Sequence, residues 1–190
     1  VEKINIPLKQ HVGGPCQPIV NVGDHVKRGQ LVATPNGLGA NIHTSLSGVV
    51  EEINDMEIIV KLDKEQTDDY VRLEQTDDKL QKIKDAGIVG VGGAGFPTGI
   101  KLSAQIPGGY VIANAAECEP ILGHNVKFME ENPEALVRGL KYIVELTGAK
   151  EGYIAIKTKY RKAMLALGKA CKNEPNISIK ILPNMYPAGD

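Results

Sequence analysis

The sequence predicts two parts, an all-β module followed by an α/β domain with a parallel sheet. Short apolar runs separated by turn residues fill residues 1–62, a spacing typical of small β domains. From residue 77 to 190, helical patterns alternate with apolar runs of strand length, and such strands pair in parallel through helical crossovers. The polar, acidic stretch 63–76 between the two parts indicates a linker.

The composition excludes several classes of partner. The 190 residues are 42% hydrophobic and 24% charged, with a net charge of −1, which gives no reason to expect nucleic acid. No apolar run has the roughly 20 residues of a membrane-spanning helix, and without a signal-peptide pattern we expect a cytoplasmic location. Cys16, Cys118 and Cys171 form no CxxC pair, so they predict no metal or iron–sulfur site.

Five short apolar runs predict the strands of the β module: 4–6, 18–20, 30–33, 48–50 and 58–60. The strings VGDHVKRGQLVA and IHTSLSGVVEEI are similar to the barrel-sandwich hybrid of biotinyl and lipoyl carrier domains. Those carriers present a modified lysine at a hairpin tip, whereas residues 34–41 contain no lysine. We therefore expect a docking or scaffold module, with His25 and His43 on its loops or faces.

The second part follows a strand–helix–strand order. Apolar runs at 110–114, 153–156 and 177–182 predict buried parallel strands, and the order predicts a doubly wound sheet. The first helix is expected to have its N-cap at Thr76 or Asp77 and to end at Gly87. Two further helices are expected over 132–148, which starts with Asn-Pro-Glu and ends at glycine, and over 160–170.

A glycine-rich stretch, GVGGAGFPTGIK, occupies residues 90–101 and precedes a short helix near 99–104. Such a turn lets backbone N–H groups approach an anion closely. From the residues alone, phosphate binding and a tight structural turn both stay open. Lys101 can reach a phosphate as a point charge or lie exposed on the helix.

A second polar stretch, NAAECEP, follows the first parallel strand at residues 114–120. Ligands of such sheets bind beyond the carboxyl ends of the strands. We therefore expect this stretch, the 157–159 turn and the 183–190 segment to meet there, with the glycine loop alongside. Glu117 and Glu119 can bind sugar hydroxyls, act as acid and base, hold a metal or remain solvated. Cys118 is expected to be a small buried residue rather than a nucleophile.

These two stretches together carry a family resemblance. GVGGAGFPTGIK followed by VIANAAECEP resembles the 51 kDa flavin-binding subunit of complex I and, more closely, the RnfC subunit of Rnf electron-transport complexes. IPLKQHVG and YPAGD extend the match over the whole chain, and the RnfC-like proteins of proline reductase systems are similar as well. The resemblance implies a Rossmann-like domain in which NADH reduces FMN, and electrons then leave through iron–sulfur clusters.

The resemblance also implies which residues form the site. Those that would line the FMN and nucleotide phosphates are Gly90, Gly92, Gly93, Gly95 and Lys101. Phe96 would stack on the nicotinamide nucleotide.

Further along the chain, Asn114 and Glu117 would contact the flavin, and Glu119 would contact NADH. Tyr186 and Gly189 match a third segment of the flavin site. No residue is assigned a catalytic or metal-binding role, because the hydride chemistry belongs to the cofactor.

The chain departs from complex I at Val91, where complex I has arginine, and at Ala116, where it has an acid. It also ends at Asp190, inside the third segment. We therefore expect a fragment with an incomplete flavin site, whose parent carries 4Fe-4S clusters further along. The implied partners are an Rnf-type membrane complex, with peripheral attachment at the cytoplasmic face of the inner membrane, or a proline reductase system. A scaffold with a vestigial nucleotide site is the alternative, and whether this piece is itself an enzyme stays open.

Overall fold

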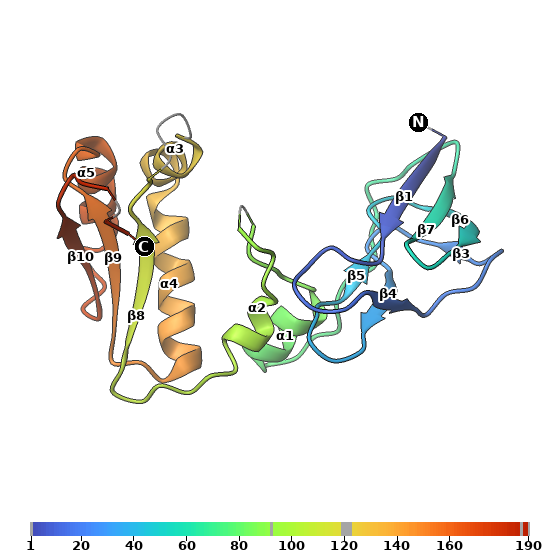
Figure 1. Cartoon of the computed structure of the whole chain (residues 1–190), viewed down its shortest axis with the longest axis horizontal. Helices are drawn as coiled ribbons and strands as arrows, with labels where there is room; N and C mark the ends of the chain where they lie inside the picture. The colour runs from blue at the N-terminus through green and yellow to red at the C-terminus, as the bar shows by residue number, and fades with distance from the viewer. Residues whose placement is uncertain (1, 92, 119–122, 187, 190) are drawn as a thin grey trace. The chain divides into compact units, whose positions relative to one another are not determined.

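The computed structural model describes residues 2–91, 93–118, 123–186 and 188–189 (Figure 1). The chain divides into two compact units, Val1–Ser103 and Ala104–Asp190. The boundaries at 62 and 76 that the sequence predicts stay predictions. Within the described residues, no helix combines the length and the apolar character needed to cross a membrane.

The first unit contains the β module, whose described strands form two antiparallel sheets (Figure 1). The four-stranded sheet consists of β1 (Lys3–Pro7), β7 (Glu57–Leu62), β6 (Gly48–Ile53) and β3 (His25–Val26). The three-stranded sheet consists of β2 (Cys16–Pro18), β4 (Leu31–Pro35) and β5 (Ile42–His43). This architecture confirms the predicted β module.

Alternation along the strands builds the core of this module. Ile58 and Val60 on β7 are fully buried, as are Val26 and Val32, because every second side chain of a strand points to the same face. The strand predicted at 18–20 lies two residues earlier in the structure, as β2. The buried side chain of β2 is that of Cys16.

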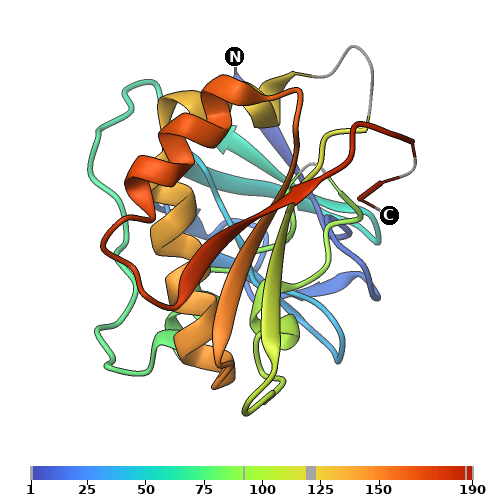
Figure 2. The same cartoon turned by 90° about the vertical axis from the view of Figure 1, so that its left-hand side faces the viewer.

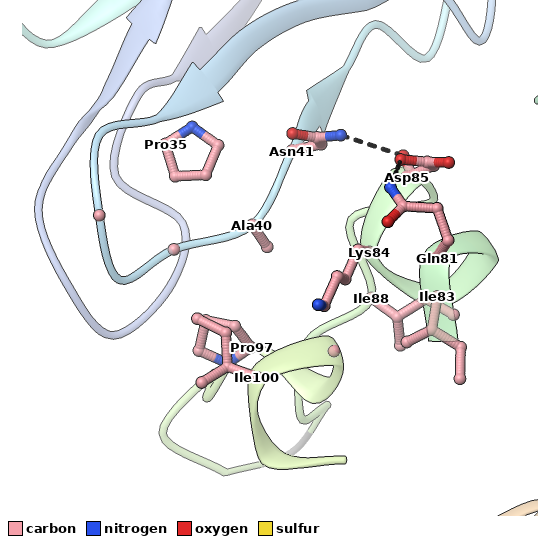
Figure 3. Close-up of a pocket in the computed structure, with 13 residues that line it drawn as sticks. Pro35, Ala40, Asn41, Gln81, Ile83, Lys84, Asp85, Ile88, Pro97 and Ile100 are labelled. Carbon is pink, nitrogen blue, oxygen red and sulfur yellow. Dashed lines mark hydrogen bonds between the residues drawn. The ribbon is translucent and has the colours of Figure 1, made fainter. Parts of the chain in front are cut away.

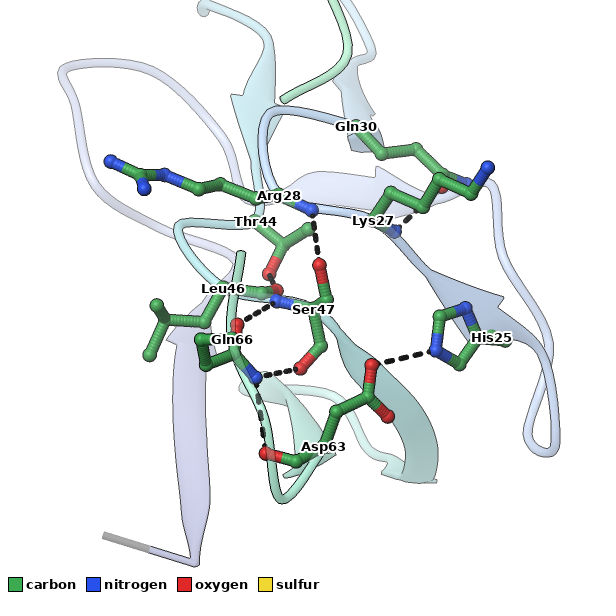
Figure 4. Close-up of polar contacts among 9 residues, drawn as sticks. All are labelled: His25, Lys27, Arg28, Gln30, Thr44, Leu46, Ser47, Asp63 and Gln66. Carbon is green, nitrogen blue, oxygen red and sulfur yellow. Dashed lines mark hydrogen bonds and ion pairs between the residues drawn. The ribbon is translucent and has the colours of Figure 1, made fainter. Parts of the chain in front are cut away.

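The polar stretch after β7 lies along the β module (Figure 4). The Gln66 side chain accepts the Ser47 N–H at 2.9 Å and donates to the Ser47 carbonyl at 2.8 Å. Nearby, Nε2 of His25 lies 2.8 Å from a carboxylate oxygen of Asp63. Most side chains of the stretch are exposed, as a linker predicts, yet its backbone is tied to the module.

Helix α1 (Lys79–Asp85) begins one or two residues later than predicted. Its N-cap is Asp78, whose carboxylate accepts two N–H groups of the first turn at 2.9 and 3.0 Å. The predicted caps, Thr76 and Asp77, precede this position, and Thr76 instead accepts the Asp78 N–H at 3.1 Å. The chain leaves the helix at Gly87 with a φ of 65°, as predicted.

The second unit is a three-stranded parallel sheet with helices (Figures 1 and 2). Its strands are β8 (Tyr110–Ala115), β9 (Glu151–Lys157) and β10 (Ile177–Leu182), in the order β10-β9-β8. Its helices are α3 (His124–Glu131), α4 (Pro133–Thr147) and α5 (Arg161–Ala170). The parallel register confirms the predicted α/β class.

The helices of this unit pack on one face of the sheet, and α4 and α5 lie to the left of the strands in Figure 2. Ile154 and Ile156 of β9 are fully buried against Leu140 and Leu167. The strand order β8, β9, β10 runs in one direction across the sheet. Right-handed crossovers between these neighbouring strands therefore place their helices on the same face of the sheet. The polar carboxyl end of the strands therefore stays uncovered by α4 and α5.

Candidate functional site

Two backbone hydrogen bonds close the base of the glycine loop in the first unit. The Gly90 N–H donates to the Phe96 carbonyl at 3.0 Å, and the Thr98 N–H donates to the Ile88 carbonyl at 2.9 Å. Between these two bonds the backbone has no regular structure, and Gly95 adopts a φ of 68° that favours glycine. Within the loop, the described residues 91, 93 and 94 are exposed.

The backbone of this loop carries unpaired donors. The N–H groups of Val91, Gly93, Ala94 and Gly95 donate to no acceptor on the described residues. The Val91 side chain is 98% exposed, and a Cβ built at Gly93 would meet nothing within 4 Å. Clustered N–H groups that have no acceptor on the described residues are available to bind an anion.

The base of the loop is held by a buried histidine that the sequence patterns did not indicate. His11 is 7% exposed, and its Nε2 accepts the Ala40 N–H at 3.2 Å. Since Nε2 is an acceptor there, Nδ1 carries the hydrogen and donates to the Val12 carbonyl at 3.2 Å. The Val12 N–H in turn donates to the Gly95 carbonyl at 3.2 Å. The bond between Val12 and Gly95 thus anchors the loop to the β module.

Two of the predicted site residues flank this loop in the same unit. Phe96 is 40% exposed, so its ring is available for stacking. Lys101 is exposed and ends α2 (Thr98–Lys101), which confirms the short helix after the loop. Because α2 has only four residues, its dipole contributes little, and the loop N–H groups dominate the attraction for an anion.

A cavity of about 270 Å³ lies behind the loop, between the β4–β5 connection and α1 (Figure 3). Its walls include Ile83, Ile88 and Ile100, and the Asn41 amide donates across it to the Asp85 carbonyl at 3.3 Å. These contacts join α1 and α2 to the β module. They hold the chain on both sides of the loop, at Ile88 and Ile100, against the β module.

The carboxyl end of β8 forms a separate polar cluster in the second unit. The Asn114 amide nitrogen donates to the Gly189 carbonyl, and its oxygen accepts the Ala116 N–H at 3.1 Å. At Gly189 the φ is 117°, and a Cβ there would come within 2.7 Å of the Ala116 Cβ. Only glycine fits this approach without displacement. Asn114 therefore holds the terminal segment at Gly189 against the end of β8. The sequence analysis predicted that these two stretches of chain would meet at this end of the sheet.

Other predicted residues lie around this cluster. A carboxylate oxygen of Glu117 accepts from the Asn125 amide at 2.8 Å, and the Glu117 carbonyl accepts from Tyr160 at 3.4 Å. Tyr186 is exposed. The predictions for Gly92, Glu119 and Asp190 fall outside the described residues. Because the glycine loop and this cluster belong to different units, their convergence stays a prediction.

A cysteine–lysine contact was not predicted. Nζ of Lys157 lies 3.3 Å from Sγ of Cys118, although the two residues are 39 positions apart. Lys157 is 4% exposed and Cys118 is half-buried. The sequence patterns place both residues at the carboxyl ends of strands, but they hold no signal that the two side chains touch.

A glycine-rich loop whose N–H groups have no acceptor on the described residues, and a parallel sheet with a polar carboxyl end, are features common among nucleotide-binding α/β proteins. Residues 83–190 match the Nuo51 FMN-binding domain family, and residues 1–74 match the RnfC barrel sandwich hybrid domain. The chain therefore belongs to the Nuo51 FMN-binding family in its RnfC-type form, which confirms the resemblance that the sequence motifs predicted.

Curated relatives cover nearly all of this chain. One subunit of the Na(+)-translocating ferredoxin:NAD(+) oxidoreductase complex of Acetobacterium woodii is 36% identical over 99% of the chain and 47% of its own length. The matching subunit of the proton-translocating ferredoxin:NAD(+) oxidoreductase complex of Clostridium ljungdahlii is 35% identical over 99% of the chain and 45% of its own length. Cobalamin reductase PduS of Salmonella typhimurium is 46% identical over 60% of the chain and 24% of its own length. The chain spans about half the length of the first two relatives.

Proposed function

We propose that this chain is the flavin- and nucleotide-binding part of an electron-transfer subunit in which NADH reduces FMN. The observation that carries the proposal is the set of N–H groups at residues 91 and 93–95 that have no acceptor on the described residues. A dianionic phosphate ester is the kind of group that such a cradle accepts without side-chain charge. The family match to residues 83–190 points to FMN as its source.

The residues of the first unit have complementary tasks in this proposal. Gly90, Gly92, Gly93 and Gly95 keep the loop free of side chains, so that phosphate oxygens can reach the backbone. Lys101, exposed one helical turn after the loop, adds a point charge toward the same anion. Phe96 offers a half-exposed ring face to the nicotinamide nucleotide.

The residues of the second unit position the flavin ring. The Asn114 amide uses one hydrogen on the Gly189 carbonyl, which leaves its second hydrogen to donate to a ring carbonyl. Gly189 lets the 183–189 segment approach Ala116 closely, and Tyr186 is exposed on that segment. Glu117 contributes a carboxylate oriented by Asn125, and Glu119 is the proposed contact to NADH. Bound FMN supplies the exchange between two-electron and one-electron transfer.

Anaerobic titration tests this function. The protein is mixed with FMN and then with NADH, while flavin absorbance is followed. We expect FMN to raise the melting temperature and NADH to bleach the flavin. Riboflavin, which lacks the phosphate, is the matched control and should bind more weakly. Tight FMN binding without bleaching would remove NADH from the proposal and leave FMN in it.

The first two relatives named above are subunits of ion-translocating complexes, so we propose a multi-subunit redox complex as the partner. An Rnf-type complex and a proline reductase system are the two proposed settings, with 4Fe-4S clusters carried by the longer protein. The proposed location is cytoplasmic, at the inner face of the membrane in the Rnf setting. If neither FMN nor NADH changes the melting temperature, a scaffold role replaces the catalytic one.

A further inference from the structure

A thiol and a buried ammonium group meet at the carboxyl end of β9. Lys157, the last residue of β9, is 4% exposed, and its Nζ lies 3.3 Å from Sγ of Cys118. Within the described part of the chain, Sγ is the hydrogen-bond partner of this ammonium, and no described carboxylate forms an ion pair with it. The arrangement therefore pairs a cation with a nucleophilic atom in a largely dry position.

This contact sets the surroundings of the thiol. The Lys157 ammonium group donates toward Sγ at 3.3 Å, and a nearby lysine is one of the features that make a cysteine reactive. Sγ also lies 3.1 Å from the Ala116 carbonyl and 3.4 Å from the Ala188 carbonyl. Cys118 therefore has a cation and two carbonyl oxygens as close neighbours.

The other two cysteines lack this environment. Burial raises the pKa of Cys16, which lies in the core of the β module. Burial also raises the pKa of Cys171, and the charge of Glu174 raises it further. Because the thiolate is the reactive species, these two residues are internal controls for Cys118 in the same molecule.

We propose that Cys118 is a redox-modification site that hydrogen peroxide oxidises, with Lys157 as the positioning residue whose ammonium group contacts Sγ. In the reaction, Sγ attacks one peroxide oxygen, an S–O bond forms and the O–O bond breaks. Sulfur loses two electrons and becomes a sulfenic acid. The second oxygen leaves as hydroxide and takes the proton that the thiol released, giving water.

The oxidised sulfur does not fit the existing contacts. The Ala116 carbonyl, the Ala188 carbonyl and Nζ of Lys157 all lie within 3.4 Å of Sγ, so an added oxygen must displace one of them. Ala116 and Lys157 belong to or adjoin strands of the sheet, whereas Ala188 belongs to the terminal segment. Oxidation of Cys118 should therefore release residues 183–189 from the sheet end. Peroxide would then change the conformation of this terminal segment.

The first experiment measures thiol reactivity. The native chain is treated with limiting iodoacetamide, and alkylation at each cysteine is followed by peptide mass spectrometry. We expect Cys118 to react at least about tenfold faster than Cys16 and Cys171, and Lys157→Met to slow it by about tenfold. Lys159→Met is the matched control, because that lysine lies over the Tyr160 ring and its loss should leave the rate unchanged. Equal rates at Cys118 and Cys171 in the unsubstituted chain would overturn the proposal.

The second experiment tests oxidation itself. Hydrogen peroxide is added with dimedone, which traps sulfenic acids, and hydrogen exchange is measured over residues 183–189. We expect a dimedone adduct at Cys118 and faster exchange in that segment, both absent in Cys118→Ser. If Lys157→Met unfolds, Lys157→Arg keeps the charge and should retain most of the reactivity. No adduct at Cys118, or an adduct formed equally at Cys171, would contradict the proposal.

Discussion

The glycine loop and the sheet end contrast in how they use their polar groups. In the loop, the N–H groups of Val91, Gly93, Ala94 and Gly95 have no acceptor on the described residues. At the sheet end, Asn114 bonds to Gly189 and Ala116, so its oxygen and one amide hydrogen already have partners. The loop is exposed, whereas the sheet end is tied together by its own side chains.

This difference indicates a division of work. Unpaired donors on a rigidly anchored loop gain most of their interaction energy only when an anion arrives. A bonded cluster instead has its geometry set before any ligand binds, and it needs particular residues at close approaches. Substitutions in the loop should therefore change binding with little change in stability, and substitutions at the sheet end should change both.

The largest effect is expected from Gly189→Ala. Its Cβ would meet the Ala116 Cβ at 2.7 Å while φ stays at 117°, so we expect a cost of about 2–4 kcal/mol to the docking of the 183–189 segment. Gly108→Ala is the matched control, since its φ is 75° and no atom lies within 4 Å of the added Cβ. It should cost only about 1 kcal/mol. Hydrogen exchange and urea unfolding measure both, and equal costs would show that crowding at Gly189 is unimportant.

A smaller effect is expected from Asn114→Ala, which removes the bonds to Gly189 and Ala116. Each hydrogen bond contributes about 1 kcal/mol, so the segment should lose about 1–2 kcal/mol of protection against hydrogen exchange. Asn173→Ala, at an exposed position, serves as the control and should change nothing. Unchanged exchange at residue 189 would mean that Asn114 does not hold the segment.

A pH dependence of stability is expected from His43, the last residue of β5. Burial lowers the pKa of His43 below its ordinary 6.5, and the charge of Asp85 partly opposes that shift. The unfolded chain then takes up the proton first, so stability is complete above about pH 6.5 and falls as the pH drops below it. We expect the urea midpoint to be lower at about pH 5.5 than at about pH 7.5, and the difference to be smaller in His43→Gln. His124→Gln, on an exposed histidine at the start of α3, is the control; equal slopes for both variants would contradict the assignment.

The smallest change in stability is expected from Gly93→Ala. No atom lies within 4 Å of the added Cβ, so unfolding should shift by no more than about 0.5 kcal/mol. Affinity for FMN should nevertheless weaken, because the methyl group occupies the approach to the unpaired N–H groups. A variant that lost stability but bound FMN normally would reverse the contrast between the two regions.

Periodic patterns made much of the fold predictable. The fully buried Ile58 and Val60 alternate along β7, and Ile154 and Ile156 lie in a continuous apolar run along β9, so both strands followed from spacing alone. Helix α3 was missed because Met129 is the one buried residue of its eight. With so weak an apolar face, tertiary contact rather than pattern determines that helix.

The site was predictable only as positions along the chain. The strand order placed Asn114, Lys157 and the 183–189 segment at one sheet end, and the structure joins them. The contacts of His11 with Ala40 and of Cys118 with Lys157 depend on side chains 29 and 39 residues apart. No local pattern encodes such distances, so only the folded chain reveals them.

The most direct test of the central claim is an amide NMR titration of the ¹⁵N-labelled chain with FMN and with riboflavin. The claim is that the loop N–H groups receive the phosphate. It predicts that FMN shifts the amide signals of residues 91 and 93–95 most strongly, and that riboflavin leaves them nearly unchanged. Equal shifts with both ligands, or FMN shifts confined to residues outside the loop, would contradict it.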